Sequence, residues 1–393
     1  MTRITKTIVL CAAIILVAAI GAVVYFYVLG GGVVGSNGQP RSFIFFPGGG
    51  ESGSEGVGNE SGQPAGADNG TGGPATTRFA QIIKEPAIGA TLTQDESKIL
   101  FYKRAGGNLF SADLNGENQE NLSNLTIVGL VDVVWSPDRS MAALSYLEDR
   151  TMRRLIETVA TTTTVFLPQN AASPVWAPDT SKRIGYIDRG NSGVRFVASD
   201  PRGKNIQTLH TSPVPDITAL WPEKSTLLFL TPPTYLAPSL SFLLPIGKTA
   251  VSYVSARGLG LLPNGLATIT AKSSVDANGT LLPLALVNKS GQLIAETRIA
   301  TVVDKCVWNI TGEALYCAVP NNPPGFLPDD WYKGKISFSD HFVTIDSRTG
   351  ISADVGTDTG QSFDAINLFL DSKNQYLFFI NKTDSTLWRL ELQ

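Results

Sequence analysis

The sequence repeats one short pattern seven times, and this repeat restricts the fold more than any other feature. A large apolar residue precedes an acid or amide by three positions in Leu92-Thr-Gln-Asp95, Trp135-Ser-Pro-Asp138, Trp176-Ala-Pro-Asp179 and Leu261-Leu-Pro-Asn264. Looser copies begin at Trp221, Trp308 and Leu368. Neighbouring copies lie 40 to 60 residues apart, and a period of this size indicates a repeat architecture.

Each copy reads as a strand, a turn and a second strand. Proline presets the turn dihedral and Asp or Asn accepts local backbone hydrogen bonds, which assigns a structural role to Asp95, Asp138, Asp179, Asn264 and Asp371. Third strands that end in turns follow in NLFSADLNG, VRFVASDPRG and FVTIDSRTG. Four short antiparallel strands per repeat predict an all-β, seven-bladed β-propeller over residues 78–393, with six or eight blades as alternatives. A β-sandwich also has short strands, but it does not explain the recurring spacing.

The ends of the predicted propeller suggest how the ring closes. The last unit offers three strands, Ala365–Leu370, Gln375–Ile380 and Thr386–Leu392. The run from Phe79 to Lys84 precedes the first unit and belongs to no repeat. We therefore expect this run to supply the outer strand of the last blade and so to remove an open sheet edge.

The turn motifs, above all Trp135-Ser-Pro-Asp138 and Leu92-Thr-Gln-Asp95, resemble those of the TolB-type propeller family, a WD40-like repeat family. The resemblance covers residues 79 to 393 and implies the propeller fold. Glu96, Arg139 and Thr180 stand where the family has glycine after the acid, and Gly265 keeps it. The α/β domain that precedes the propeller in TolB has no counterpart here, so the resemblance implies the propeller alone.

The N-terminal region predicts a membrane anchor. Arg3 and Lys6 precede an uncharged run from Thr7 to Leu29, whose apolar part of about 22 residues would span roughly 33 Å as a helix. A cleaved signal peptide is the alternative, but its apolar region is shorter and ends in small residues, whereas this run ends in aromatic ones. The positive-inside rule places residues 1–6 in the cytoplasm, residues 7–29 in the membrane and the rest outside the cytoplasm.

Residues 30–77 differ sharply in composition from the rest of the chain. Glycine accounts for 16 of the 47 residues from Gly30 to Thr76, and most of the others are small or polar. Such a segment cannot bury enough apolar surface to offset the entropy of ordering it. It is therefore predicted to be a disordered, flexible linker between the anchor and the propeller.

Composition and motifs exclude several classes of function. The net charge of −3 argues against nucleic acid as a partner. The chain has only two histidines, and no G-x-S-x-G or H-E-x-x-H motif occurs, so we assign no catalytic residue, no metal site and no cofactor. An enzyme that uses a funnel carboxylate as general base remains the alternative.

Cys306 and Cys317 flank a hairpin centred on Thr311-Gly312 and should face each other across adjacent strands. A disulfide is expected there if the propeller lies outside the cytoplasm, and two buried thiols are the alternative.

Two long loops between second and third strands are predicted binding elements on the funnel face. One includes Tyr235, and the other, Pro320 to Asp340, carries Phe326, Trp331 and Tyr332. Aromatic side chains of this kind anchor interfaces, and long loops on a rigid scaffold often bind partners. The alternative is that these aromatic side chains fold down and cap a blade.

Four acids near the starts of innermost strands are predicted to point at one mouth of the funnel: Asp132, Asp216, Asp304 and Asp364. They would hold a cation or a basic peptide segment, because calcium accepts several carboxylate oxygens. The alternative is that each acid only terminates a turn.

The sequence as a whole favours a single-pass, membrane-anchored, extracytoplasmic β-propeller that binds a protein of the cell envelope or acts as a scaffold there. The alternatives are an envelope enzyme, a propeller that binds a small ligand or cation through its funnel carboxylates, and a purely structural spacer.

Overall fold

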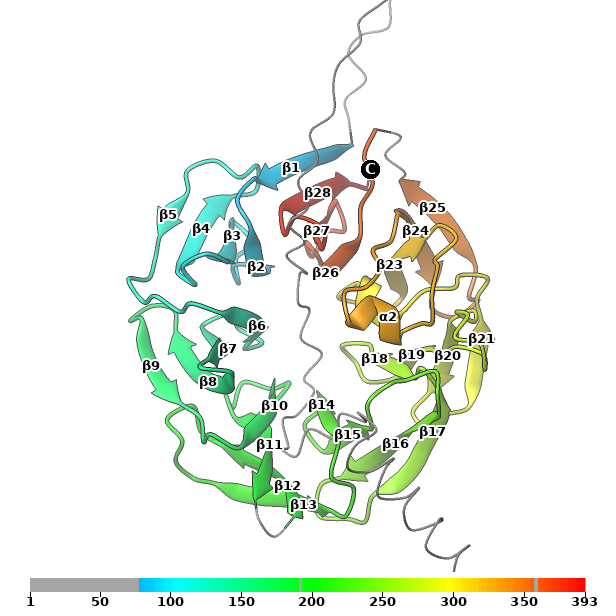
Figure 1. The fold of residues 1–393 in the computed structure, drawn as a ribbon, viewed down its shortest axis with the longest axis horizontal. Helices are drawn as coiled ribbons and strands as arrows, with labels where there is room; N and C mark the ends of the chain where they lie inside the picture. The colour runs from blue at the N-terminus through cyan, green and yellow to red at the C-terminus, as the bar shows by residue number, and fades with distance from the viewer. Residues whose placement is uncertain (1–77, 191–192, 357–359, 393) are drawn as a thin grey trace, which may run out of the picture. The chain divides into compact units, whose positions relative to one another are not determined.

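The computed structural model describes residues 78–190, 193–356 and 360–392. These residues form seven four-stranded antiparallel sheets arranged as blades around a central axis (Figure 1), which confirms the prediction of an all-β, seven-bladed propeller. The predicted cytoplasmic segment, anchor and linker, residues 1–77, lie outside the described residues. Within the described part of the chain, no helix is long and apolar enough to cross a bilayer.

Blades 1 to 6 follow the chain in order, with the innermost strand first. Blades 1 to 3 contain β2(Ala87–Leu92), β3(Lys98–Lys103), β4(Leu109–Asp113) and β5(Glu120–Asn121); β6(Leu130–Trp135), β7(Met141–Glu148), β8(Thr151–Thr158) and β9(Thr163–Phe166); and β10(Ala171–Trp176), β11(Ile184–Gly190), β12(Gly193–Ser199) and β13(Gln207–Ser212). Blades 4 to 6 contain β14(Thr218–Glu223), β15(Thr226–Leu230), β16(Pro238–Pro245) and β17(Val251–Arg257); β18(Gly260–Pro263), β19(Ile269–Ser273), β20(Ala285–Asn288) and β21(Leu293–Glu296); and β22(Cys306–Trp308), β23(Ala314–Pro320), β24(Asp340–Asp346) and β25(Ser352–Gly356). Two short helices, η2(Val303–Lys305) and α2(Asp329–Tyr332), belong to blade 6.

Blade 7 joins the two ends of the described chain. It contains β26(Ala365–Leu370), β27(Tyr376–Asn381) and β28(Leu387–Glu391), and its outer strand is β1(Phe79–Ile83). Strand β1 pairs antiparallel with β28, with Phe79 opposite Leu390. The ring therefore closes as the sequence predicts, with the N-terminal strand covering the edge of the last blade.

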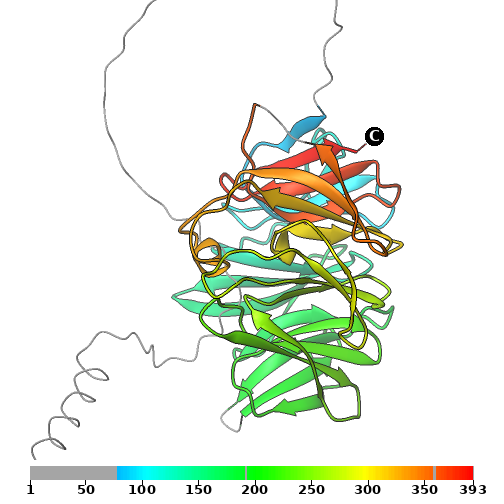
Figure 2. The ribbon, with the colours of Figure 1, turned by 90° about the vertical axis from the view of Figure 1, so that its right-hand side faces the viewer.

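The second strand of most blades contains a buried apolar run because neighbouring blades cover both of its faces. In β3, for example, the four residues from Ile99 to Tyr102 are all buried. Figure 2 shows the blades edge-on, stacked around the ring. These runs account for the continuous apolar segments in the sequence.

The two faces of the ring differ in the loops that they carry. The loops between second and third strands lie on one face, which we call the funnel face, and the turns between first and second strands lie on the other, the turn face. Strand β28 runs from the funnel face to the turn face, where the N–H of Leu392 donates to the carbonyl of Gln375. Arg78 lies at this same end, since its carbonyl accepts a hydrogen bond from the N–H of Glu391 (2.8 Å). The chain thus enters the propeller at the turn face.

The tryptophans of the repeat connect neighbouring blades. The indole N–H groups of Trp135, Trp176 and Trp308 donate to the carbonyls of Gly89 (2.7 Å), Val134 (2.8 Å) and Leu262 (2.9 Å), each on the innermost strand of the preceding blade. The repeated residue therefore stabilises the joint between blades as well as its own sheet. Trp221 occupies the same position, but its indole nitrogen has no partner among the described residues.

The acid of the repeat organises the turn that follows it. Asp138 accepts hydrogen bonds from the hydroxyls of Ser136 (2.7 Å) and Ser140 (2.8 Å) and from the N–H of Ser140 (3.1 Å). The next residue, Arg139, has a φ of 59°, and Glu96 in blade 1 has a φ of 57°. Glycine adopts this left-handed conformation most readily, which explains why the resembling family has glycine there.

Candidate functional site

The innermost strands surround a cavity of about 680 Å³ in the central funnel. All seven blades contribute to its lining, and most of the wall is aliphatic. Irregular backbone in several innermost strands directs side chains into it. The register of β6 shifts between Leu130 and Asp132, and Ser173 in β10 and Asn367 in β26 have φ values of 46° and 50°. Bulges of this kind re-aim side chains, and they are frequent next to functional sites.

The long loop of blade 6 covers part of the funnel mouth, and we call residues 321–339 the lid. Figure 2 shows its helix α2 at one face of the ring. The lid is held to blades 4 and 5: Asp329 accepts hydrogen bonds from the Thr234 hydroxyl (3.2 Å) and the Tyr235 N–H (3.0 Å), and the Leu327 N–H donates to the Gly279 carbonyl (2.9 Å). Lid residues between Tyr332 and Ser337 line the cavity.

The aromatic residues of the lid have different environments. Trp331, predicted from the sequence as an interface anchor, is fully buried and stacks on Phe338 with ring centroids 5.3 Å apart. It is therefore unavailable to a partner, because the lid folds down and packs it into the core. Phe326 is 51% exposed and stacks on Tyr235 with centroids 4.9 Å apart. Tyr332 is half-buried, and its hydroxyl donates to the carboxylate of Asp304 (2.5 Å).

A fully buried lysine ties the lid to blades 6 and 7. The Lys305 ammonium lies 2.8 Å from the carboxylate of Asp340 and 2.7 Å from that of Asp364, and it also donates to the Ala365 carbonyl (2.8 Å). The indole N–H of Trp331 donates to Asp364 (3.0 Å). Burial raises the pKa of Asp340, although the charge of Lys305 opposes this shift. Each of the three N–H groups of the Lys305 ammonium therefore has an acceptor.

The structure divides the four predicted funnel acids into two groups. Asp132 and Asp304 line the cavity, whereas Asp216 and Asp364 are absent from its described lining. Asp216 forms an ion pair with Arg189 (3.0 Å) near the funnel face, and Asp364 belongs to the buried lysine cluster.

The pKa values of both cavity acids, Asp132 and Asp304, are raised. Desolvation by the surrounding protein raises the pKa of Asp132, and the nearby Arg154 partly offsets this. Desolvation also raises the pKa of Asp304, although the hydrogen bond from Tyr332 acts in the opposite direction and lowers it. The two residues come from blades 2 and 6, and each has its own separate polar neighbour. The arrangement therefore differs from a carboxylate pair that shares one proton or one metal ion.

Two cationic side chains that are not among the residues predicted from the sequence, Lys382 and Arg104, also line the cavity. Lys382, on blade 7, donates to the Trp331 carbonyl (2.7 Å) and lies 4.3 Å from the centroid of that ring. Burial lowers the pKa of Lys382 to about 8. Arg104 lies in the loop between β3 and β4 of blade 1.

Only the position of Lys382 and Arg104 in the repeat could have predicted from the sequence that they line the cavity. Both follow the second strand of a blade directly, at the place where loops reach the funnel. Lys305 has no comparable signal, because its partners lie 35 and 59 residues away in the chain.

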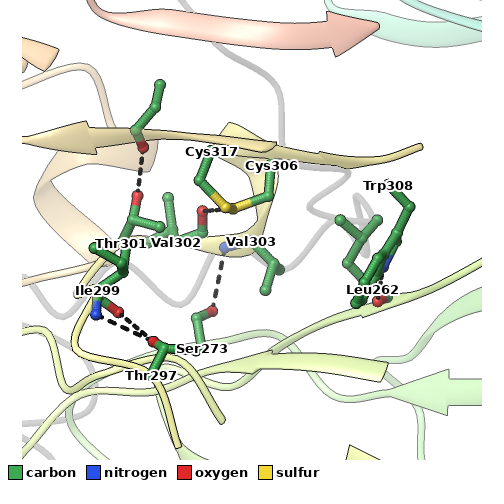
Figure 3. The surroundings of a disulfide bond; sticks show 11 residues. Leu262, Ser273, Thr297, Ile299, Thr301, Val302, Val303, Cys306, Trp308 and Cys317 are labelled. Carbon is green, nitrogen blue, oxygen red and sulfur yellow. Dashed lines mark hydrogen bonds between the residues drawn. A yellow bond between two sulfur atoms is a disulfide. The ribbon is translucent and has the colours of Figure 1, made fainter. Parts of the chain in front are cut away.

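Cys306 and Cys317 form a disulfide bond between β22 and β23 (Figure 3). They are direct partners in the strand register, with Cα atoms 4.1 Å apart. In Figure 3 the bond lies among hydrogen bonds that join blades 5 and 6, including Val303 N–H to the Ser273 hydroxyl (3.4 Å). Cys306 directly follows Lys305, so the disulfide holds the first residue of β22 next to the buried lysine.

The side chains that commonly bind metal ions are scattered among residues 78–190, 193–356 and 360–392. No group of three or more His, Cys, Asp or Glu side chains there is arranged to hold a metal ion. Of the four predicted funnel acids, only Asp132 and Asp304 line the cavity, so the structure does not bring all four together.

Comparison with known proteins supports the fold. No protein-family model and no curated protein matches the sequence. An uncharacterized protein from Listeria monocytogenes has a similar structure, with a TM-score of 0.52 and 10% identity over 79% of this chain and 96% of that one.

Two further solved structures are similar at lower scores. TolB from Acinetobacter baumannii has a TM-score of 0.43 and 9% identity over 79% of this chain, and the match spans 64% of the TolB chain. An oligogalacturonate lyase in complex with manganese has a TM-score of 0.39 and 11% identity over 78% of each chain. Similarity at such low identity concerns the fold alone, and the seven-bladed propeller itself rests on the order of the strands in the seven sheets.

Proposed function

We propose that the protein is a membrane-anchored β-propeller held outside the cytoplasm, and that its funnel face binds a protein of the cell envelope. The anchor rests on the uncharged run from Thr7 to Leu29 and on the basic residues that precede it. The binding role rests on the surface of the described propeller.

The observation that carries the binding role is an exposed apolar pair on the funnel face. Phe326 and Tyr235 stack on each other, and Phe326 is 51% exposed while Trp331 of the same lid is fully buried. Leu236, next to Tyr235, is 68% exposed. An aromatic pair with an aliphatic neighbour is the kind of surface that anchors a protein interface. We call these three residues the rim patch, and we propose that it receives an apolar side chain of the partner.

The rim patch is held in place before any partner arrives. Asp329 fixes the backbone of Tyr235 through a hydrogen bond, and Arg257 donates to the Tyr235 carbonyl (2.7 Å). The Phe326 N–H donates to Asp330 (3.0 Å). Two loops from different blades are therefore fixed relative to each other, which lowers the entropy cost of binding.

The arrangement of the acids favours binding over carboxylate catalysis. A pair of catalytic carboxylates must approach one substrate bond from two sides at a defined separation. Asp132 and Asp304 lie on blades 2 and 6 with separate polar neighbours, and the other two predicted funnel acids are engaged elsewhere.

The entry point of the chain is compatible with this role. Arg78 lies at the turn face, on the side opposite the rim patch. The first described residue therefore lies on the other face of the ring from the proposed binding surface.

Site-specific photocrosslinking in cells tests the proposal. A photoreactive amino acid replaces Leu236 in the rim patch of the full-length protein, and in a matched control it replaces Leu266, which is 59% exposed and lies in a turn on the opposite face. We expect one envelope protein to crosslink from position 236 and not from position 266. The crosslink should be lost in the Phe326→Ser variant, because a polar side chain removes half of the stacked pair.

Point variants are needed for this test because the whole lid cannot be removed without opening the core. Deletion of residues 321–339 would also remove the buried Trp331 and Leu327. Equal crosslinking from positions 236 and 266, or a crosslink that Phe326→Ser leaves unchanged, would contradict the proposal.

A further inference from the structure

The charged side chains that line the funnel cavity differ in whether they have polar partners within the protein. Four charged side chains line it: Arg104, Asp132, Asp304 and Lys382. Three of them have the partners described above. Among the described residues, the guanidinium of Arg104 has no hydrogen bond and no ion pair within the protein. Arg104 is therefore the one charged residue of the described lining whose side chain has no polar partner within the described protein.

The position of Arg104 favours an anion as ligand. Its backbone N–H donates to the Pro86 carbonyl (2.8 Å), which fixes the start of the loop at the funnel mouth. The side chain is half-buried, and burial lowers its pKa. A guanidinium that has lost part of its hydration gains from a counter-ion, and its planar fork matches a carboxylate in two parallel hydrogen bonds.

The other charges restrict the anion to a single negative charge. Arg104 and Lys382 lie on the adjacent blades 1 and 7, and Asp132 and Asp304 lie on the flanking blades 2 and 6. The joint between blades 1 and 7 is thus a cationic sector with an acid on each side. A phosphate ester carries up to two charges near neutral pH and would be repelled by the acids more strongly than a carboxylate.

The cavity wall restricts the rest of the ligand. Near the cationic sector it is formed by Ile88, Val133, Ile366 and Ile380, and Tyr332 supplies the one aromatic ring in the described lining. A wall of branched aliphatic side chains packs against an aliphatic body and offers little stacking surface for a flat ring. A volume of about 680 Å³ lies within the range of small-molecule sites.

We propose that the funnel cavity binds a small aliphatic monocarboxylate, with its carboxylate paired to Arg104 and its hydrocarbon body against the aliphatic wall. This site is separate from the rim patch and does not depend on a protein partner.

Calorimetric titration of the full-length protein in lipid nanodiscs with hexanoate tests the proposal, with empty nanodiscs as the reference. Arg104→Gln removes the charge and keeps a polar side chain, and Arg348→Gln is the matched control at an exposed arginine in a turn between outer strands. We expect saturable binding that Arg104→Gln weakens about tenfold or more and Arg348→Gln leaves unchanged. Acetate, hexan-1-ol and hexyl phosphate should each bind more weakly than hexanoate.

Two results would overturn the proposal. One is hexanoate binding of equal strength to the wild-type protein and Arg104→Gln. The other is the absence of saturable binding for straight-chain carboxylates from hexanoate to decanoate. The free energy of unfolding of Arg104→Gln should match that of the wild type, since no internal contact is removed, and its photocrosslink from position 236 should persist. Failure of the carboxylate site is therefore distinguishable from failure of the protein-binding role.

Discussion

Lys305 is the residue on which the joint between blades 6 and 7 depends. Its ammonium lies between two carboxylates that are both fully buried, and one of them also accepts the indole hydrogen bond of Trp331. A buried ion pair contributes little net stability relative to apolar residues of the same shape, but removal of one member leaves an uncompensated charge. The cluster therefore specifies how the lid and the two blades fit together.

Replacement of Lys305 by Met should destabilise the protein strongly. The substitution leaves Asp340 and Asp364 facing each other in the core without a cation, and we expect the free energy of unfolding to fall by about 3–5 kcal/mol. Urea denaturation followed by tryptophan fluorescence measures the change. Lys333→Met is the control, because Lys333 forms an exposed pair with Asp329 (3.4 Å) and should change stability by less than about 0.5 kcal/mol. Equal effects of the two substitutions would show that the buried cluster has no special role.

Lys382 should make stability depend on alkaline pH. Burial lowers its pKa from 10.5 to about 8, so between these values the unfolded chain binds more protons than the folded protein. The free energy of unfolding of the wild type, relative to Lys382→Met, should therefore rise as the pH increases from 8 to 10.5. With allowance for the solvent that reaches the side chain, we expect a rise of about 1–2 kcal/mol. A difference between the two proteins that stays constant from pH 7.5 to 10.5 would refute the lowered pKa.

Among the elements, the hairpin β22–β23 is the one held by a covalent bond. The disulfide closes a short loop, because its two cysteines are 11 positions apart in the sequence, and both cysteines are buried. A disulfide lowers the conformational entropy of the unfolded chain, and for a loop of this length we expect it to add about 2–3 kcal/mol to the free energy of unfolding.

Reductant should therefore lower the stability of the wild type and not that of the Cys306→Val/Cys317→Val variant. We expect urea unfolding with dithiothreitol to show the loss of about 2–3 kcal/mol in the wild type alone. Thiol alkylation of the unfolded, unreduced wild type, read by mass spectrometry, supplies the control for the bond itself. If both thiols are alkylated in that sample, the bond is absent in solution.

The elements that sequence reasoning could predict are those formed by local contacts. Alternating and apolar strands, turns with Pro and Asp, and the register of Cys306 with Cys317 all follow from residues near one another in the chain. The lid is different. Trp331 is buried because Asp364, 33 residues later, accepts its hydrogen bond, and no local pattern distinguishes it from the exposed Phe326.

At the scale of the whole molecule, the ring is closed by the antiparallel pairing of β1 with β28. Phe79 contributes most to this seam, since it is buried and lies within 5.3 Å of the Phe363 ring and 5.7 Å of the Phe342 ring, measured between centroids. The seam could be predicted from the sequence because the last repeat lacks a strand. The unpaired charge of Arg104 could not, because it depends on which side chains meet across the funnel.

Phe79→Ala should weaken the closed ring by about 3–4 kcal/mol through the loss of buried ring contacts. Hydrogen exchange should show faster exchange in β1 and β28 than in the blades opposite. Val128→Ala is the control, because Val128 is 70% exposed and its substitution should change stability by less than about 0.5 kcal/mol. Uniform acceleration in all seven blades would contradict closure as the local weak point.

The entry of the chain at Arg78 has a mechanical consequence. Any tension in the preceding segment reaches the propeller first at β1, the same strand that closes the ring. A pull along β1 loads its ladder with β28 before it loads any other sheet. The blade that joins the two ends of the propeller is therefore also the blade that bears the load, and under force the ring would open there while the other six blades are still folded.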